Sequence, residues 1–194
     1  MGKHIKSLLF LVIIALALRA SVVEAYRIPS GSMLPTLQIG DHLLVTKFDY
    51  ALRYPVPFVR KSFYVHSFPD RGDIVVFTRP DNPATAQVDE SNKNIIKRVI
   101  GLPGEKIEVV NGKVFINEKE LHESYAVWSA GGVGLWGPYV VPENHVFVLG
   151  DNRDFSKDSR FWHDPYLPVE LIKGRAQIIY LNLQSPSRIG SLIR

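Results

Sequence analysis

Over most of its length the chain alternates apolar and polar residues with a period of two, and turn residues separate the alternating runs. Successive side chains of a strand point to opposite faces, so this pattern predicts short strands with one buried face. The predicted strands are residues 42–48, 73–79, 94–100, two runs within 106–117, 145–150 and 175–183. Between those two runs, Asn111-Gly112 predicts a hairpin turn, because both positions tolerate positive φ. The body of the chain is therefore predicted to be mainly β.

The N-terminal 25 residues differ, because a basic start is followed by a long apolar stretch. One interpretation is a secretory signal, with Val23-Glu24-Ala25 offering small residues before a cut. The other is a membrane anchor: residues 7–25 would form roughly 28 Å of helix at about 1.5 Å per residue, close to a hydrocarbon core of about 30 Å. The anchor is favoured, because a cut after Ala25 would leave the next segment on a frayed terminus. The prediction is an anchor at 1–25 and one β domain at 26–194.

Two stretches of the body do not alternate. Residues 81–92 are polar and rich in turn residues, and they predict a loop. Residues 128–142 combine four glycines with two tryptophans. This second stretch predicts a loop of a small inserted lobe, in preference to a binding surface or a pair of tryptophans at headgroup level.

Composition and charge limit the function classes. The 194 residues are 46% hydrophobic and 22% charged, which supports one packed domain. The formal charge is +4, of which residues 1–27 carry +3. The positive charge thus lies beside the apolar stretch, where anionic headgroups would attract it, and the body shows no basic patch for nucleic acid. The absence of cysteine excludes disulfides, thiolate metal sites and a cysteine nucleophile.

Several catalytic motifs are missing from the sequence. It contains no G-x-S-x-G elbow, no S-x-x-K at the serine segment, no H-E-x-x-H and no phosphate-binding loop. The six histidines form no metal-ligand spacing. The sequence therefore predicts neither a metal nor a cofactor.

The stretch "YRIPSGSMLPTL", residues 26–37, sets two serines around a glycine between prolines. A serine hydroxyl needs a base to become a nucleophile, and a lysine can serve if its pKa, ordinarily about 10.4, is lowered by desolvation. On the strand 94–100, Lys97 shares a face with Ile95 and Val99. This lysine is either a buried, perturbed amine or a charge that protects an edge strand from aggregation. The strand alone favours the edge charge, and the serine segment shifts the balance toward the buried amine.

The stretch "LGDNRDFSKDSRFW", residues 149–162, packs charged residues around Ser156 directly after a predicted core strand. It is either a solvated turn with weak surface ion pairs or a polar scaffold that holds a neighbouring site rigid, with Ser156 hydrogen-bonding the Lys97 nitrogen. So dense a set of charges after a core strand favours the scaffold.

Four blocks in order resemble type I signal peptidases, the membrane-bound serine proteases that remove signal peptides from exported proteins. They are "RIPSGSMLPTLQIGDHLLVTKF", "RGDIVVF", "IIKRVIGLPGEKIEV" and "LGDNRDFSKDSRFW", about a third of the chain. The resemblance implies that Ser32 is the nucleophile and Lys97 the general base. It implies an oxyanion hole made by the Ser32 N–H and Ser30, and an orienting role for Ser156. The same corner would be braced by Asp158 and Arg160.

The resemblance also implies a substrate and a fold. A shallow apolar cleft would accept small residues at positions −1 and −3 of a signal peptide, and its matching residues here are Ile28, Met33, Leu37 and Ile96. The implied fold is an antiparallel β core domain with a small inserted β-lobe at about 107–145, behind one N-terminal transmembrane helix.

The implied location is a bacterial cytoplasmic membrane, crossed once, with the catalytic domain on the extracytoplasmic side. The implied partners are signal peptides of exported preproteins and the lipid bilayer, with secretion machinery nearby and no nucleic acid. Two alternatives stay open at this point: a specialised maturation protease for one or few partners, and a noncatalytic anchored β-module.

Overall fold

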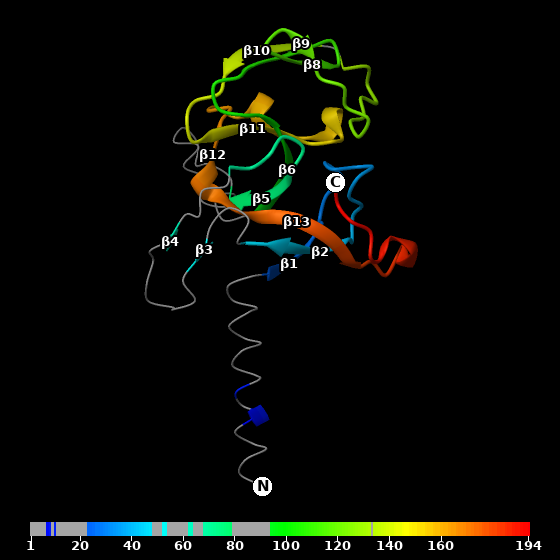
Figure 1. The fold of residues 1–194 in the computed structure, drawn as a ribbon. Coiled ribbons are helices and arrows are strands. Elements are labelled where there is room, and N and C mark those ends of the chain that lie inside the picture. The colour runs from blue at the N-terminus through cyan, green and yellow to red at the C-terminus, as the bar shows by residue number, and fades with distance from the viewer. Residues whose placement is uncertain are drawn as a thin grey trace.

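The computed structural model describes most of the body of the chain (Figure 1). The described residues are 7–8, 10, 23–47, 52–53, 62–63, 68–78, 94–132 and 134–194. The loop predicted at 81–92 and most of the predicted span at 7–25, namely residues 9 and 11–22, lie outside these residues. Within the described part of the chain, no helix has both the length and the hydropathy that a membrane crossing requires.

A seven-stranded sheet in which every neighbouring pair is antiparallel forms the larger part of the fold. In sheet order its strands are β1 (Val23–Arg27), β2 (His42–Thr46), β13 (Ile172–Leu181), β5 (Ile74–Thr78), β6 (Asn94–Gly101), β11 (His145–Leu149) and β12 (Leu167–Pro168). The alternating runs therefore predicted five of these seven strands. The two-residue strands β3 (Leu52–Arg53) and β4 (Ser62–Phe63) pair separately.

Strand β1 begins earlier than the predicted domain boundary. Val23, Glu24 and Ala25 were assigned to the membrane span, but they pair with Thr46, Val45 and Leu44 of β2. The apolar run of the sequence continues into the edge strand β1 without a polar spacer. Hydropathy alone therefore did not separate the predicted membrane span from this strand. The β structure thus starts three residues before position 26.

The inserted lobe is a four-stranded antiparallel sheet between β6 and β11, and its labelled strands lie at the top of Figure 1. In sheet order it contains β10 (Leu135–Val140), β7 (Lys106–Val110), β8 (Lys113–Ile116) and β9 (Lys119–Glu120). The predicted hairpin turn is confirmed, since Asn111 and Gly112 have φ of +46° and +79°. The loop predicted at 128–142 is partly wrong, because it contains β10. Gly137-Pro138 interrupts the alternation there, where the pairing with β7 also shifts register.

Both faces of the larger sheet are covered by apolar residues. On β5, Ile74 and Val76 enter one core cluster, whereas Val75 and Phe77 enter a second cluster on the opposite face. A third cluster joins the lobe to the sheet through residues such as Phe147. The remaining elements are the short 3-10 helices η1 (Arg153–Phe155), η2 (Ser159–Phe161), η3 (Val169–Leu171) and η4 (Pro186–Arg188).

Candidate active site

Ser32 lies on the loop 28–41, which connects β1 to β2. The loop is closed at its base by backbone hydrogen bonds from Ile28 N to Asp41 O (2.9 Å) and from Gly40 N to Ile28 O (3.0 Å). The Met33 side chain next to the serine is fully buried in the core. Because the loop is fixed both at its base and by the core, the half-buried Ser32 is held in place.

Lys97 lies on β6, an interior strand between β5 and β11, and it is only 4% exposed. Its Nζ donates hydrogen bonds to Ser32 Oγ (2.7 Å) and to Ile96 O (3.0 Å). The edge-strand interpretation of this lysine is therefore wrong, and the buried amine is the observed state. The fold brings together two residues that are 65 positions apart in the sequence.

Burial gives this lysine an unusual acid–base character. Desolvation lowers the pKa of Lys97 from 10.5 to about 8, although the nearby negative charges of Asp158 and Asp151 act in the opposite direction. With a pKa near 8, roughly a tenth of the amine is uncharged at pH 7, whereas an ordinary lysine is almost entirely protonated. The uncharged amine can accept a proton from the hydroxyl that it contacts.

The loop after β11 holds the backbone on both sides of the serine hydroxyl. Asn152 donates from its backbone N–H to Ser32 O (3.1 Å) and from Nδ2 to Gly31 O (3.0 Å). At Gly150 any side chain would collide with this arrangement, since a Cβ there would lie 2.6 Å from Ser32 O. Sequence reasoning assigned no role to Asn152. Its only signal was its place inside the charged block at 149–162.

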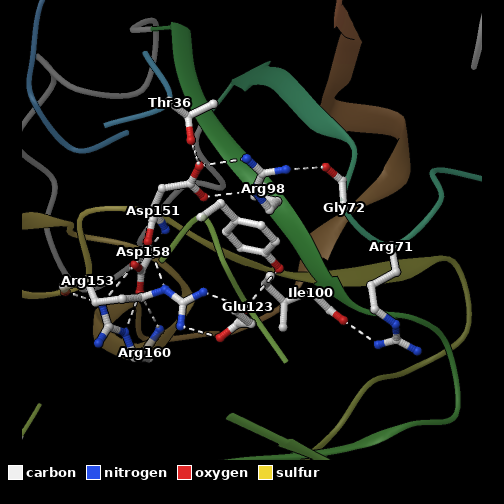
Figure 2. Close-up of polar contacts among 12 residues, drawn as sticks. Thr36, Arg71, Gly72, Arg98, Ile100, Glu123, Asp151, Arg153, Asp158 and Arg160 are labelled. Atoms are coloured by element: carbon white, nitrogen blue, oxygen red, sulfur yellow. Dashed lines mark hydrogen bonds and ion pairs between the residues drawn. The ribbon is translucent and has the colours of Figure 1, made fainter. Parts of the chain in front are cut away.

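A buried ion pair connects this loop to the lysine strand (Figure 2). The carboxylate of Asp151 accepts hydrogen bonds from Arg98 Nε (2.8 Å) and Nη2 (2.7 Å), and from Thr36 Oγ1 (2.5 Å). Asp151 is 0% exposed and the Arg98 side chain 2%. Arg98 follows Lys97 on β6, and Thr36 lies four residues after Ser32 on its loop. The carboxylate of Asp151 therefore joins the strand that carries Lys97 to the loop that carries Ser32.

Three further charged residues of the block, Arg153, Asp158 and Arg160, are also buried, whereas Lys157 is exposed. Asp158 accepts from Gly150 N (3.0 Å) and from Arg160 Nε (2.8 Å), so both residues brace the corner as expected. Arg153 makes a two-point ion pair with Glu123 of the inserted segment, at 2.6 and 2.7 Å. Asp158 is 0% exposed and Arg160 6%. The interpretation of this block as a solvated turn is therefore wrong: its ion pairs form a buried polar scaffold, although one part of the scaffold interpretation, the bond from Ser156, is not observed.

The predicted hydrogen bond between Ser156 and Lys97 is wrong for this structure. Ser156 is buried, but its Oγ has no hydrogen-bond partner among the described residues. The amine instead bonds Ser32 and the carbonyl of its own neighbour, Ile96. The Ser156 hydroxyl packs against Gly150, where a Cβ would collide with it.

The oxyanion-hole prediction concerns Ser30 and the N–H of Ser32. Ser30 is exposed, two residues before the nucleophile candidate. Neither its hydroxyl nor the Ser32 N–H donates a hydrogen bond to any group in the part of the chain that the structure describes. The role of these two donors in binding an oxyanion stays a prediction.

The four side chains predicted to line the substrate cleft gather in one place. Ile28, Met33 and Leu37 belong to a single core cluster, and Ile96 packs against it. Of the four, only Ile96 is partly exposed, while Met33 and Leu37 are 0% exposed. Met33 and Leu37 are therefore closed off inside the core in this conformation, and direct contact between them and a peptide stays a prediction.

A β fold that holds a serine hydroxyl against a buried, readily deprotonated amine defines a class of serine hydrolases that work without histidine. Comparison with known proteins narrows this class. The profile of the family described as "Signal peptidase, peptidase S26" matches residues 1–181.

Three relatives show how extensive the similarity is. Signal peptidase I of Pseudomonas fluorescens is 35% identical over 223 residues, covering 95% of this chain and 73% of that protein. Signal peptidase I of Leptolyngbya laminosa is 40% identical over 188 residues, covering 97% and 82%. A probable signal peptidase I-2 of Synechocystis sp. is 41% identical over 188 residues, covering 96% and 75%. The chain therefore belongs to the signal peptidase I family, peptidase S26, and is a serine endopeptidase.

Membership of this family excludes the noncatalytic β-module.

Proposed function

We propose that the protein removes signal peptides from exported preproteins with a Ser32/Lys97 dyad. The observation that carries this proposal is the 2.7 Å hydrogen bond between Lys97 Nζ and Ser32 Oγ, made by an amine that is 4% exposed. The lowered pKa of Lys97, about 8, supports the same roles. A base in direct contact with the nucleophile needs no histidine to relay the proton.

In the proposed reaction, neutral Lys97 takes the proton of Ser32 as Oγ attacks the scissile carbonyl carbon. The protonated amine then gives that proton to the leaving peptide nitrogen as the C–N bond breaks, which leaves an acyl ester on Ser32 and restores the neutral base. A water molecule, deprotonated by Lys97, attacks the ester carbonyl. Collapse of this second intermediate releases the signal-peptide carboxylate and returns the proton to Ser32.

The charge that develops on the substrate oxygen requires hydrogen-bond donors. The backbone N–H of Ser32 and the hydroxyl of Ser30 are the proposed pair, since both are unused by the described residues. Loss of one such donor lowers the rate by roughly 10²–10³-fold. Asn152 contributes indirectly, because it fixes the carbonyl of Ser32 and thereby the orientation of the adjoining peptide groups.

In this proposal, the apolar cluster that contains the four cleft residues forms the floor of the cleft that receives the −1 and −3 side chains. Ile96 offers the only partly exposed surface of the four cleft residues, and fully buried Met33 lies beside it in the same cluster. An extended peptide places the side chains of −1 and −3 on one face and that of −2 on the other. A closed apolar floor admits alanine or serine at these positions and excludes larger side chains by steric conflict.

The proposed location is the bacterial cytoplasmic membrane, which the chain would cross once with the catalytic domain outside the cytoplasm. Proteins of this family are typically membrane-bound. The positive charge of residues 1–27 and the apolar run before β1 support an anchor that ends next to the catalytic sheet. Signal peptides lie in the same bilayer, so the anchor would keep the dyad at the depth where their cleavage sites emerge.

A precursor series tests the specificity. Changing the −1 residue of a preprotein from alanine to leucine is expected to reduce kcat/KM by more than about 200-fold, since one excess methylene already costs roughly 10–200-fold in a fitted apolar pocket. The same change at −2 is the matched control and should alter kcat/KM by less than about threefold, because that side chain faces away. Equal cleavage of the two −1 forms would contradict the proposed cleft.

A second assay separates a general enzyme from a specialised maturation protease. Several unrelated preproteins, each with small −1 and −3 residues, are incubated with the full-length protein in lipid vesicles. A general signal peptidase cuts all of them at the predicted bond. Cleavage of a single precursor would instead identify the specialised alternative.

A further inference from the structure

The C-terminal segment, residues 182–194, turns back after β13 and lies against the serine loop; in Figure 1 the C mark lies above β13, next to the blue trace. Backbone hydrogen bonds from Ile179 N to Ser191 O (3.0 Å) and from Ile193 N to Gln177 O (2.9 Å) fasten the segment to its own strand. The Ile193 side chain is 7% exposed and enters the same core cluster as Met33. The segment is therefore an ordered part of the fold.

Two side chains of this segment converge on the carboxylate of Asp41, which closes the serine loop and is 0% exposed. Arg188 donates to it from Nε (3.1 Å) and from Nη2 (2.7 Å), and Asn182 donates from Nδ2 (2.6 Å). Burial alone would raise the pKa of Asp41, but the hydrogen bonds from Arg188 and Asn182 hold it below its ordinary value. The carboxylate is thus kept charged and paired inside the protein.

Arg188 also reaches the middle of the serine loop. Its Nη2 donates to the carbonyl oxygen of Thr36 (2.9 Å), and the Thr36 hydroxyl donates to Asp151, the partner of Arg98. Contacts therefore run without a break from the C-terminal segment, through the loop that carries Ser32, to the residue after Lys97. Asn182 in turn is fixed, since its Oδ1 accepts from the N–H groups of Gln184 (2.9 Å) and Ser185 (2.8 Å).

We propose that the C-terminal segment is a clamp for the nucleophile, in which Arg188 and Asn182 are positioning residues that hold the serine loop against Lys97. Both lie beyond Leu181, where the match to the family profile ends. The proposal rests on the Ser32/Lys97 dyad of the proposed function. An error of about 1 Å in the placement of a reacting group can cost roughly 10²-fold in rate, so a loop closed by one buried carboxylate depends strongly on that carboxylate's partners.

The test compares Arg188→Ala with Arg194→Ala in the full-length protein. Arg194 is exposed, lies in the same segment, and makes no hydrogen bond or ion pair with the described residues, so its loss is a matched removal of charge. At a temperature where all variants are fully folded, Arg188→Ala should lower kcat by roughly 10–100-fold and Arg194→Ala by less than about twofold. Arg188→Lys should recover part of the loss, because an ammonium can reach one of the two acceptors but not both.

Hydrogen exchange supplies a readout that a general loss of stability would not produce. In Arg188→Ala, the amides of Ile28 and Gly40, which close the serine loop, should exchange faster, while those of the β7–β8 hairpin keep their wild-type rates. Equal acceleration in both regions would mean a global effect and would overturn the clamp. Full kcat in Arg188→Ala would overturn it as well.

Ser32→Ala in the same assay distinguishes a failure of the clamp proposal from a failure of the proposed function. An inactive Ser32→Ala together with a fully active Arg188→Ala rejects the clamp and leaves the dyad in place. An active Ser32→Ala rejects the proposed function itself.

Discussion

Ser32→Ala and Lys97→Met each reduce precursor cleavage by about 10⁴–10⁶-fold, the range found when one member of a serine catalytic unit is removed. The reason is that, among the described residues, Lys97 Nζ is the base in contact with the hydroxyl, at 2.7 Å, and the proposed reaction uses it in both the acylation and the hydrolysis of the ester. The double variant should be no worse than either single variant, because residues that act as one unit are not additive. The measurement is single-turnover cleavage of a preprotein by the full-length protein in vesicles.

Lys113→Met is the matched control for this first prediction. Its side chain is 58% exposed and pairs only with Glu120 on the lobe surface, so cleavage should change by less than about twofold. If either dyad variant retained more than a few per cent of wild-type activity, the assignment of nucleophile or base would be wrong.

Unfolding cannot explain the loss in Lys97→Met, because this variant is expected to be more stable than the wild type. The folded-state pKa of about 8 lies below the ordinary 10.5, so at pH below 8 folding must hold a buried, charged ammonium. At about 1.4 kcal/mol per pKa unit, methionine should raise the free energy of unfolding by about 3 kcal/mol at pH 7. Between pH 8 and 10.5 only the unfolded wild type binds the proton, so the wild type gains stability there and the difference shrinks.

The second large effect is expected for Asp151→Asn, which leaves the Arg98 guanidinium buried without its counter-charge. Removal of one partner from a buried ion pair costs about 3–5 kcal/mol, and Arg98 has a side chain only 2% exposed. The hydroxyl of Thr36 loses its ionised acceptor at the same time, so the serine loop is weakened too. Urea unfolding of the wild type and the variant measures the difference.

Glu120→Gln provides the comparison for this second prediction. It breaks the Lys113–Glu120 pair, whose side chains are 58% and 50% exposed, and an exposed pair contributes about 0–1 kcal/mol. If Asp151→Asn were as mild as Glu120→Gln, the buried scaffold would not be a source of stability.

Local sequence patterns were sufficient for much of the β structure. On β5 the residues at 74–77 alternate between two core clusters, as period two requires, and Asn111-Gly112 forms the turn that its tolerance of positive φ predicts. The pattern of apolar and polar residues did not predict two of the strands correctly. At 23–25 an apolar run continues into an edge strand, and at 135–140 Gly137-Pro138 interrupts the alternation of β10.

The site was only partly visible in the sequence. Whether Lys97 is an edge charge or a buried base depends on the neighbours of its strand, and β5 and β11 are set by the topology rather than by residues 94–100. Only the resemblance to type I signal peptidases implied that Ser32 and Lys97 are neighbours, and the two are in contact. The residue patterns alone did not bring them together. They did not predict that Ser156 makes no bond to the amine, since the direction of a hydroxyl is decided by packing at Gly150.

Contacts between segments that are distant in the sequence could not be predicted from it. Arg188 and Asp41 are 147 positions apart, and each looks like an ordinary surface residue in its own segment. Only the return of the chain after β13 brings them together.

Titration of the Lys97 amine by NMR, in the full-length protein with labelled lysine, shows whether this amine can act as the base. The signal is assigned by its absence from Lys97→Met, and the pH dependence of cleavage is recorded in parallel. We expect a pKa near 8 for Lys97 and a rate that rises with pH through the same value. A Lys97 signal that titrates near 10.5, with a rate indifferent to pH around 8, would contradict a buried amine acting as the base.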